Sequence, residues 1–319
     1  MAQYTKMMCS VALLALAGLS PLLAGRPLNG TPVKKDSTPQ FIRIQRDAKN
    51  EPVALETAIV RYKPASGEGD LVVDLIGVVH VGDRGYYQKL NKLFEQYDVL
   101  LYELVASPGT RIPKGGKREL DNPLAWVQKI MTLVLDLESQ TQRIDYTRKN
   151  FVHADLSFAQ MAEKIKERGD DGFTLTLSIL ADVLRQQNLQ ALKKAKTPGK
   201  DEPGFDFNLL LDPAGPSKIK RIMAEQLADL DNAILPTLNT ILVADRNQAA
   251  LKVMQKEMTK GKKKIGIFYG AAHMPDFEKR LRDDFDLRRV SDQWLPAWDL
   301  RLRERSLEDL LGGLLERLP

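Results

Sequence analysis

Cysteine is almost absent from this chain of 319 residues. The single cysteine, Cys9, lies in an N-terminal segment that we expect to be removed, and its surroundings do not match a lipid-attachment site. A mature protein without cysteine has no disulfide, no thiolate metal ligand and no cysteine nucleophile. The chemistry of the protein must therefore rest on other side chains.

The apolar stretch near the N-terminus is shorter than the ~20 residues that a membrane-spanning helix needs. It covers residues 7–16, follows Lys6 and gives way to small residues and Pro21. This layout is typical of a secretory signal peptide, which we place at residues 1–24 with cleavage after Ala24. We therefore expect a secreted or periplasmic protein. The alternative is an uncleaved segment that anchors the protein, which would be its only contact with a membrane.

A strong excess of one charge sign is also missing, because the formal net charge is only +5. The densest basic runs, 193–196 and 262–264, contain no interleaved aromatic residues and match no nucleic-acid-binding motif. Such runs are usually solvated faces. We expect no nucleic-acid partner.

The overall composition, 43% hydrophobic and 28% charged, is that of a globular protein with a sizeable core. A lead-in rich in proline and glycine at residues 25–40 precedes a single predicted α/β domain over 41–319. The predicted fold is a mixed central sheet built from two strand–GxxH–helix units, with a large helical insertion at about 117–260.

Hydrophobic patterning places the individual elements of this domain. We predict strands over 58–62, 71–79, 98–105, 151–156, 287–290 and 294–298, and helices over 84–96, from about 157, and over 307–318. The order of strand, helix and strand around residues 71–105 predicts a parallel pair with a right-handed crossover. Glu103 would then lie on a strand next to the one that carries His80.

Histidine is scarce, because the chain contains only His80, His153 and His273. Two of them end a G-x-x-H pattern after an apolar strand, GVVH at 77–80 and GAAH at 270–273. Ligands of open α/β sheets bind beyond the carboxyl ends of strands, where imidazole can bind a metal or transfer a proton. A single histidine there can equally be half-buried and bonded to a carbonyl, but the repetition predicts a shared functional site.

His80, Glu103 and His273 support two kinds of chemistry. As ligands, two imidazoles and a carboxylate suit a divalent metal such as Mn, Co, Zn or Fe, which would activate water. Without a metal, Glu103 or one histidine can act as general base while the other histidine orients substrate or stabilises an oxyanion. Both routes lead to hydrolysis.

Three further side chains accompany these residues. His153 and Asp155 can supply a third ligand or hydrogen bonds to the ligands. Arg246 can clamp a carboxylate, either that of Glu103 or that of a substrate, and the alternative is a surface salt bridge. Glu103 itself sits in an apolar strand, where its burial is costly without a partner.

Four motifs carry a resemblance to a known family: GVVH at 77–80, YEL at 102–104, ADRN at 244–247 and GAAHMP at 270–275. With them the chain resembles the TraB/PrgY/GumN family, which is related to the Tiki metalloproteases and, more distantly, to erythromycin esterase and ChaN-like proteins. The resemblance covers about residues 55–285 and implies an α/β core with a helical insert. It also implies an active site of His80, Glu103 and His273 supported by Arg246. Asp245 departs from the Glu that many relatives carry there.

Residues and resemblance together predict an exported hydrolase, metal-dependent, that uses a His/Glu/His site to activate water. Its expected partner is a peptide or a small ester, since Tiki-like relatives are metalloproteases and the esterase branch opens a lactone. The alternative is a non-catalytic exported protein that binds a peptide, a metal or haem with the same residues. A purely structural exported domain is a third reading.

Overall fold

The computed structural model describes residues 40–107, 109–110, 112–115, 135, 137–169, 178, 181, 212–228 and 239–304. Outside them lie the predicted signal peptide 1–24, all but the last residue of the lead-in 25–40, much of the insertion at about 117–260, and the helix predicted over 307–318.

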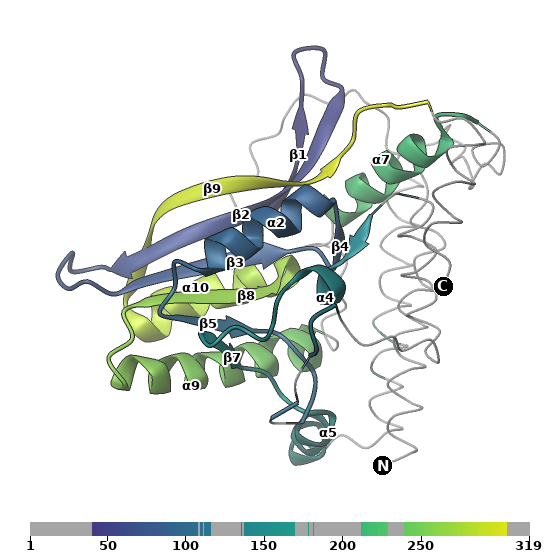
Figure 1. Ribbon diagram of the computed structural model, residues 1–319. Coiled ribbons are helices and arrows are strands. Elements are labelled where there is room, and N and C mark those ends of the chain that lie inside the picture. The colour runs from purple at the N-terminus through teal and green to yellow at the C-terminus, as the bar shows by residue number, and fades with distance from the viewer. Residues whose placement is uncertain are drawn as a thin grey trace.

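Over the described residues, a seven-stranded mixed sheet forms the centre of the fold (Figure 1). Its order is β1-β2-β3-β8-β5-β7, and β9 also pairs with β2. The strands β3, β8, β5 and β7 run parallel, whereas β1, β2 and β9 form an antiparallel flank. The bounds of the sheet strands are β1 Ile42–Arg46, β2 Pro52–Pro64, β3 Val72–Val78, β5 Val99–Tyr102, β7 Phe151–His153, β8 Lys264–Gly270 and β9 Leu287–Asp299. A separate two-stranded ribbon pairs β4 (Val81–Gly82) with β6 (Glu138–Ser139).

Six α-helices fall within the residues that the structure describes. They are α2 Arg84–Phe94, α4 Gln140–Arg143, α5 Phe158–Glu167, α7 Gly215–Ala228, α9 Asp245–Thr259 and α10 Met274–Phe285. A π-helical turn, η4 (Thr240–Ala244), leads into α9, and a 3-10 turn, η5 (Ala271–His273), leads into α10. None of the helices in the described ranges is long and apolar enough to cross a bilayer.

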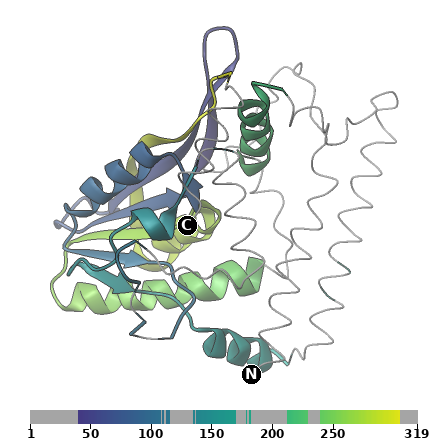
Figure 2. The ribbon, with the colours of Figure 1, turned by 45° about the vertical axis from the view of Figure 1, so that its right-hand side comes forward.

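The helices cover both faces of the sheet. Figure 1 and Figure 2 show α2 on one face and α9 and α10 on the other. Two separate apolar cores fill the layers between, one containing Leu90 and Phe94 of α2 and the other Met254 of α9 and Phe277 of α10. The arrangement is a three-layer α/β/α fold.

Continuous apolar runs in the central strands follow from this layering, because successive side chains of a strand point to opposite faces. In β5, Leu100 packs into the core under α2, whereas Leu101 packs into the core under α9 and α10. Gly266 of β8 makes room for its neighbour, since a Cβ atom there would lie only 2.5 Å from Cδ1 of Leu100.

Several predicted elements are confirmed. The strand predicted over 58–62 is part of β2, the strand predicted over 71–79 contains β3, and the two pair antiparallel. The helix predicted over 84–96 is α2, and Asp83 is its N-cap residue. Ser157 caps α5 with a reciprocal capping box that involves Gln160.

Two predictions about strands are wrong. The strands β3 and β5 are parallel, but they are not neighbours, because β8 pairs with both of them. In the tail, the two strands predicted over 287–290 and 294–298 form one continuous strand, β9. The polar residues 291–293 do not interrupt it, because they are exposed to solvent while their backbone pairs with β2.

Candidate active site

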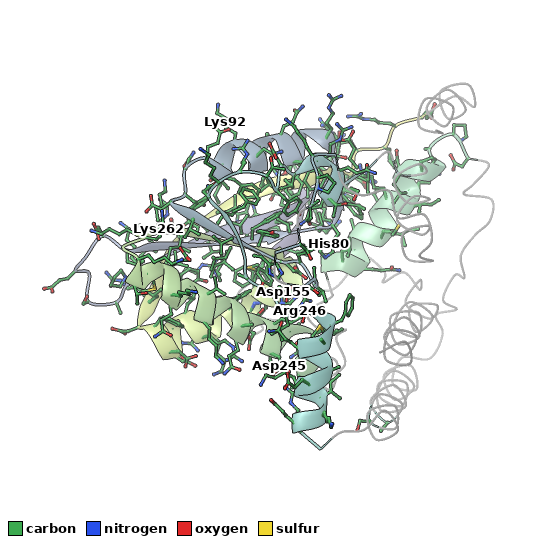
Figure 3. The ribbon with its side chains drawn as sticks, turned by 60° about the horizontal axis from the view of Figure 1, so that its bottom comes forward. His80, Lys92, Asp155, Asp245, Arg246 and Lys262 are labelled. Atoms are coloured by element: carbon green, nitrogen blue, oxygen red, sulfur yellow. The ribbon has the colours of Figure 1, made fainter. Side chains whose placement is uncertain are left out.

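Three parallel strands end at one edge of the sheet and bring the predicted residues together. Val78 of β3 pairs with Gly270 of β8, and Tyr102 of β5 pairs with Phe268 of β8. His80 and Glu103 therefore emerge on either side of the end of β8. Figure 3 shows His80 and Arg246 close together at this edge, whereas Lys92 and Lys262 lie away from it.

Gly270, the glycine of the second G-x-x-H motif, lies at the centre of the site. Its N–H donates to Oε2 of Glu103 at 2.7 Å. A Cβ atom on Gly270 would lie 3.4 Å from Oε2 of Glu103, 3.6 Å from Nε2 of His80 and 3.8 Å from Cδ2 of His273. All three predicted residues thus surround one position, which only glycine leaves open.

Arg246 joins the buried part of the site, and all five of its guanidinium N–H groups are used. Nη2 donates to Oε1 of Glu103 at 2.6 Å and to Oδ2 of Asp155 at 2.7 Å, and Nε donates to Oδ1 of Asp155 at 2.9 Å. Nη1 faces the carbonyl oxygen of Leu242 at 3.1 Å and Nε2 of His273 at 3.4 Å. The predicted clamp on Glu103 is present, and no N–H remains for a substrate carboxylate.

Asp155 is the second carboxylate of this network, and its side chain is fully buried. Besides Arg246, it accepts hydrogen bonds from the backbone N–H groups of Leu104 at 3.0 Å and Leu156 at 2.7 Å. Asp155 is therefore linked to Glu103 indirectly, since both carboxylates bind the guanidinium of Arg246. Asp155 also ties the end of β5 to the start of the segment before α5.

His273 is buried and its ring is held by an amide. Asn247 donates from Nδ2 to the carbonyl oxygen of His273 and to Oδ2 of Asp276, both at 2.9 Å. The amide oxygen of Asn247 must then face Nδ1 of His273, at 2.7 Å. Nδ1 consequently carries the proton, and Nε2 accepts from Arg246. Burial lowers the pKa of His273 to about 4, against the opposing charge of Glu103, so the ring is neutral at neutral pH.

His80, by contrast, is exposed to solvent. Its Nδ1 contacts Oε1 of Gln140 at 3.1 Å, and Nε2 of Gln140 donates to the hydroxyl of Tyr146 at 2.9 Å. In this orientation of the Gln140 amide, Oε1 accepts from Nδ1 of His80, so the lone pair lies on Nε2, which faces Gly270. The two motif histidines therefore differ: one is solvent-accessible and the other is enclosed.

The charges of the site favour an ionised Glu103. Burial alone raises the pKa of a carboxyl group, but the interactions of Glu103 with His273, Arg246 and His80 and with the Gly270 N–H outweigh burial here and lower its pKa. Burial lowers the pKa of Arg246, yet the hydrogen bond with Asp155 and the charge of Glu103 raise it overall. Two carboxylates therefore share one guanidinium. The site carries an excess negative charge beside His80.

No family model, no curated protein and no solved structure matches this chain.

His153 lies next to the site but does not face it. Its Nε2 contacts the carbonyl oxygen of Leu104 at 2.6 Å, so Nε2 donates and is not free to bind a metal. This is the arrangement of a histidine bonded to a neighbouring carbonyl. It fixes the backbone immediately after Glu103.

The donor set does not fit a metal ion shared by His80, Glu103 and His273 as these residues lie. Oε1 of Glu103 and Nε2 of His273 both face the cationic guanidinium of Arg246, where a second cation would be repelled. Among the described residues, no group of three or more His, Cys, Asp or Glu side chains is arranged to hold a metal ion.

Sequence reasoning missed Gln140 and Tyr146 and gave no role to Asn247. Asn247 follows Arg246 within the ADRN motif and is fully buried, so its position beside a predicted site residue was a usable signal. Gln140 and Tyr146 lie about 60 residues from His80 in sequence and match no pattern around it. Only the fold brings them to the histidine.

Proposed function

We propose that this protein is an exported hydrolase of peptide or ester bonds in which His80 is the general base. The observation that carries the proposal is the asymmetry of the two histidines. His80 is exposed and has its Nε2 lone pair at the site, whereas His273 is buried and already bonded through both ring nitrogens.

In the proposed reaction, Nε2 of His80 takes a proton from a water molecule that attacks the scissile carbonyl. The ionised carboxylate of Glu103 stabilises the imidazolium that forms by its negative charge. His80 then returns the proton to the leaving amine or alcohol. Arg246 and His273 are positioning residues, because Arg246 binds Glu103 and His273 accepts from Arg246.

The proposal extends to the fold and the family. We interpret the succession β3, His80, α2 and the succession β8, His273, α10 as two strand–GxxH–helix units, with a helical insertion at about 117–260 between them. Membership of the TraB/PrgY/GumN family is supported by the gathering of His80, Glu103 and His273 around Gly270 and by the ion pair of Glu103 with Arg246. Export rests on the signal-peptide pattern of residues 1–24.

The test is hydrolysis by the purified protein of a panel of peptides and of esters with aliphatic alcohol leaving groups, which an exposed imidazole alone does not cleave. We expect a His80→Gln variant to lose about 100-fold or more in kcat, the usual contribution of a general base. His153→Gln, which keeps a side-chain donor for Leu104, is the matched histidine control and should retain activity. Equal rates in wild type and His80→Gln would refute the assignment.

A metal assay separates this mechanism from the metal-dependent one. We expect a chelator to leave the rate unchanged and Mn²⁺, Co²⁺ or Zn²⁺ not to raise it. Near-stoichiometric bound metal in the wild type, lost in both His80→Ala and His273→Ala, would instead establish a metallohydrolase.

A non-catalytic binding protein is the second candidate, and one observation favours it. Both oxygens of Glu103 and all guanidinium N–H groups of Arg246 already have hydrogen-bond partners, as expected of a network that stabilises the fold without taking part in a reaction. In that case no substrate of the panel is turned over, and a peptide or haem binds with an affinity that falls in His80→Gln.

A further inference from the structure

A second charged region lies apart from the site of His80. It is a cavity of about 400 Å³ between the start of α2, the strand β6, the first half of α7 and the residues that follow β9. None of the residues proposed for hydrolysis is among the described residues that line it. Figure 1 shows α7 beside the end of β9 in this part of the molecule.

Two backbone contacts make this cavity a defined part of the fold. The hydroxyl of Ser217, in α7, donates to the carbonyl oxygen of Arg303 at 3.1 Å and accepts from its N–H at 3.2 Å. Nε of Arg221 donates to the carbonyl oxygen of Leu300 at 2.6 Å. The segment after β9 is therefore attached to α7, and the two together form one wall of the cavity.

The acidic side chains of the cavity are all paired with cations. Asp83 accepts from Nζ of Lys220 at 2.8 Å and from the N–H of Asp299 at 2.6 Å. Glu138 binds Arg143, with 2.6 Å between Nε and Oε2. Asp83 and Glu138 therefore contribute no free negative charge to the cavity.

The basic side chains, by contrast, are in excess. Asp299 faces two guanidinium groups, with Oδ1 2.9 Å from Nε of Arg301 and Oδ2 2.5 Å from Nη2 of Arg303. Arg84 lines the same cavity and makes no hydrogen bond or ion pair with any residue that the structure describes. Among the described residues, once Asp83 is matched with Lys220, Glu138 with Arg143 from outside the lining, and Asp299 with one arginine, two positive charges remain, that of Arg84 and one of the pair Arg301 and Arg303.

We propose that this cavity is a binding site for a small phosphate-bearing anion, held by Arg84, Arg301 and Arg303. Guanidinium groups match phosphate oxygens with two parallel N–H donors each. A phosphomonoester carries about −1.5 to −2 charge at neutral pH, which equals the surplus of the cavity. The lining side chains are mostly charged or polar, so the group that carries the phosphate should be polar, as a sugar is.

The test is isothermal titration of the full-length protein with inorganic phosphate, glucose 6-phosphate and, as the uncharged counterpart, glucose. We expect saturable binding of the two phosphates with dissociation constants on the order of 1 mM or tighter, and none of glucose. Arg84→Gln should weaken phosphate binding about tenfold, since one charge-assisted hydrogen bond is lost. This variant removes an exposed side chain that has no partner among the residues that the structure describes, so its melting temperature should equal that of the wild type.

A matched control removes a similarly exposed arginine elsewhere. Arg282, on α10, is exposed to solvent as Arg84 is, and it pairs with Asp283. Arg282→Gln should leave binding unchanged. An equal loss of phosphate affinity in Arg282→Gln and Arg84→Gln would show that binding is non-specific charge attraction, and the proposed site would be wrong.

Two further measurements complete the test. Affinity should rise as the pH is increased from about 5.5 to 7.5, because the dianion predominates above the second phosphate pKa of ≈ 6. Binding of inorganic phosphate as tight as that of glucose 6-phosphate would identify free phosphate as the ligand, and tighter binding of the ester would identify a phosphomonoester. Absence of binding by both would overturn the proposal without bearing on hydrolysis, which uses none of these residues.

Discussion

Arg246 binds Asp155 through two parallel hydrogen bonds, Nε to Oδ1 at 2.9 Å and Nη2 to Oδ2 at 2.7 Å. The pair is enclosed, with 8% of the arginine side chain and none of the aspartate side chain exposed. It connects α9 to the segment after β7, and through Glu103 it reaches the end of β5. The guanidinium of Arg246 thus joins three segments of the chain that form the proposed active site.

Loss of this guanidinium should destabilise the protein severely. Arg246→Met leaves the carboxylates of Glu103 and Asp155 buried without a cation, and such a change costs about 3–5 kcal/mol. Urea denaturation measures the difference in unfolding free energy. Arg148→Met is the control, since its partner Glu95 is 61% exposed and a pair of this kind contributes about 0–1 kcal/mol. Similar losses in the two variants would contradict the central role of Arg246.

His273 should make stability depend on pH in a definite window. The pKa of His273 is about 4 in the folded protein, below the ordinary 6.5, because the ring is buried. Between pH 6.5 and 4 the unfolded chain binds a proton that the folded protein does not, so stability falls as the pH is lowered through this range. The expected loss between pH 6.5 and 5 is about 1–2 kcal/mol.

The variant His273→Gln isolates this effect. Its unfolding free energy should change less between pH 6.5 and 5 than that of the wild type, whatever its absolute stability. The depressed pKa of Glu103 does not interfere, because the stability it contributes is lost only below its unfolded value near 4.5. An unchanged slope in His273→Gln would show that the ring is not held neutral.

The glycines of the two G-x-x-H motifs should respond differently to alanine. In Gly270→Ala, the methyl group would lie among Glu103 and His80 at 3.4–3.6 Å, so we expect hydrolysis to fall at least about tenfold by displacement of substrate or water. In Gly77→Ala, the methyl group would meet Cγ of Met274 at 3.3 Å and the carbonyl oxygen of Ala58 at 3.4 Å. This variant should lose about 1 kcal/mol of stability but keep its activity. Kinetics and thermal melts of both variants decide the matter.

Tyr146 should influence catalysis through Gln140. Tyr146→Phe removes the acceptor of Nε2 of Gln140, which frees the amide to rotate and present its nitrogen to His80. The proton of His80 would then no longer be fixed on Nδ1, and we expect kcat to fall about tenfold with KM little changed. Nitrogen-15 NMR of the histidine rings reports the tautomer. A mixture of tautomers already present in the wild type would contradict the assignment.

Much of the fold follows from local sequence. The apolar run 71–79 and the amphipathic pattern over 84–96 indicate their elements because hydrophobic period is a local property. The neighbours of each strand are not local properties. In sequence β5 follows β3, but in the sheet β8 lies between them. The apolar residues of a wholly buried strand do not specify its neighbour, because any strand of suitable direction and length can form the same backbone hydrogen bonds.

The site shows the same division. His80, Glu103 and His273 are recognisable because polar residues at the ends of apolar strands are costly unless they serve a purpose. Whether each is exposed, and which nitrogen of a ring carries the proton, depends on Asn247, Gln140 and Tyr146, which reach the histidines only in the folded chain. For that reason the sequence makes the two motif histidines look equivalent, whereas the fold separates them.

The central position of β8 also bears on how the protein is made. On a ribosome, Lys264–Gly270 emerges after every other strand of the parallel group, so β3 and β5 must remain unjoined until late in synthesis. A nascent chain that ends at Lys263 presents two apolar strands with open edges, and such edges pair readily with other chains. The sheet and the proposed active site are therefore completed together, late in synthesis. Until then the open strand edges must be kept from pairing with other chains.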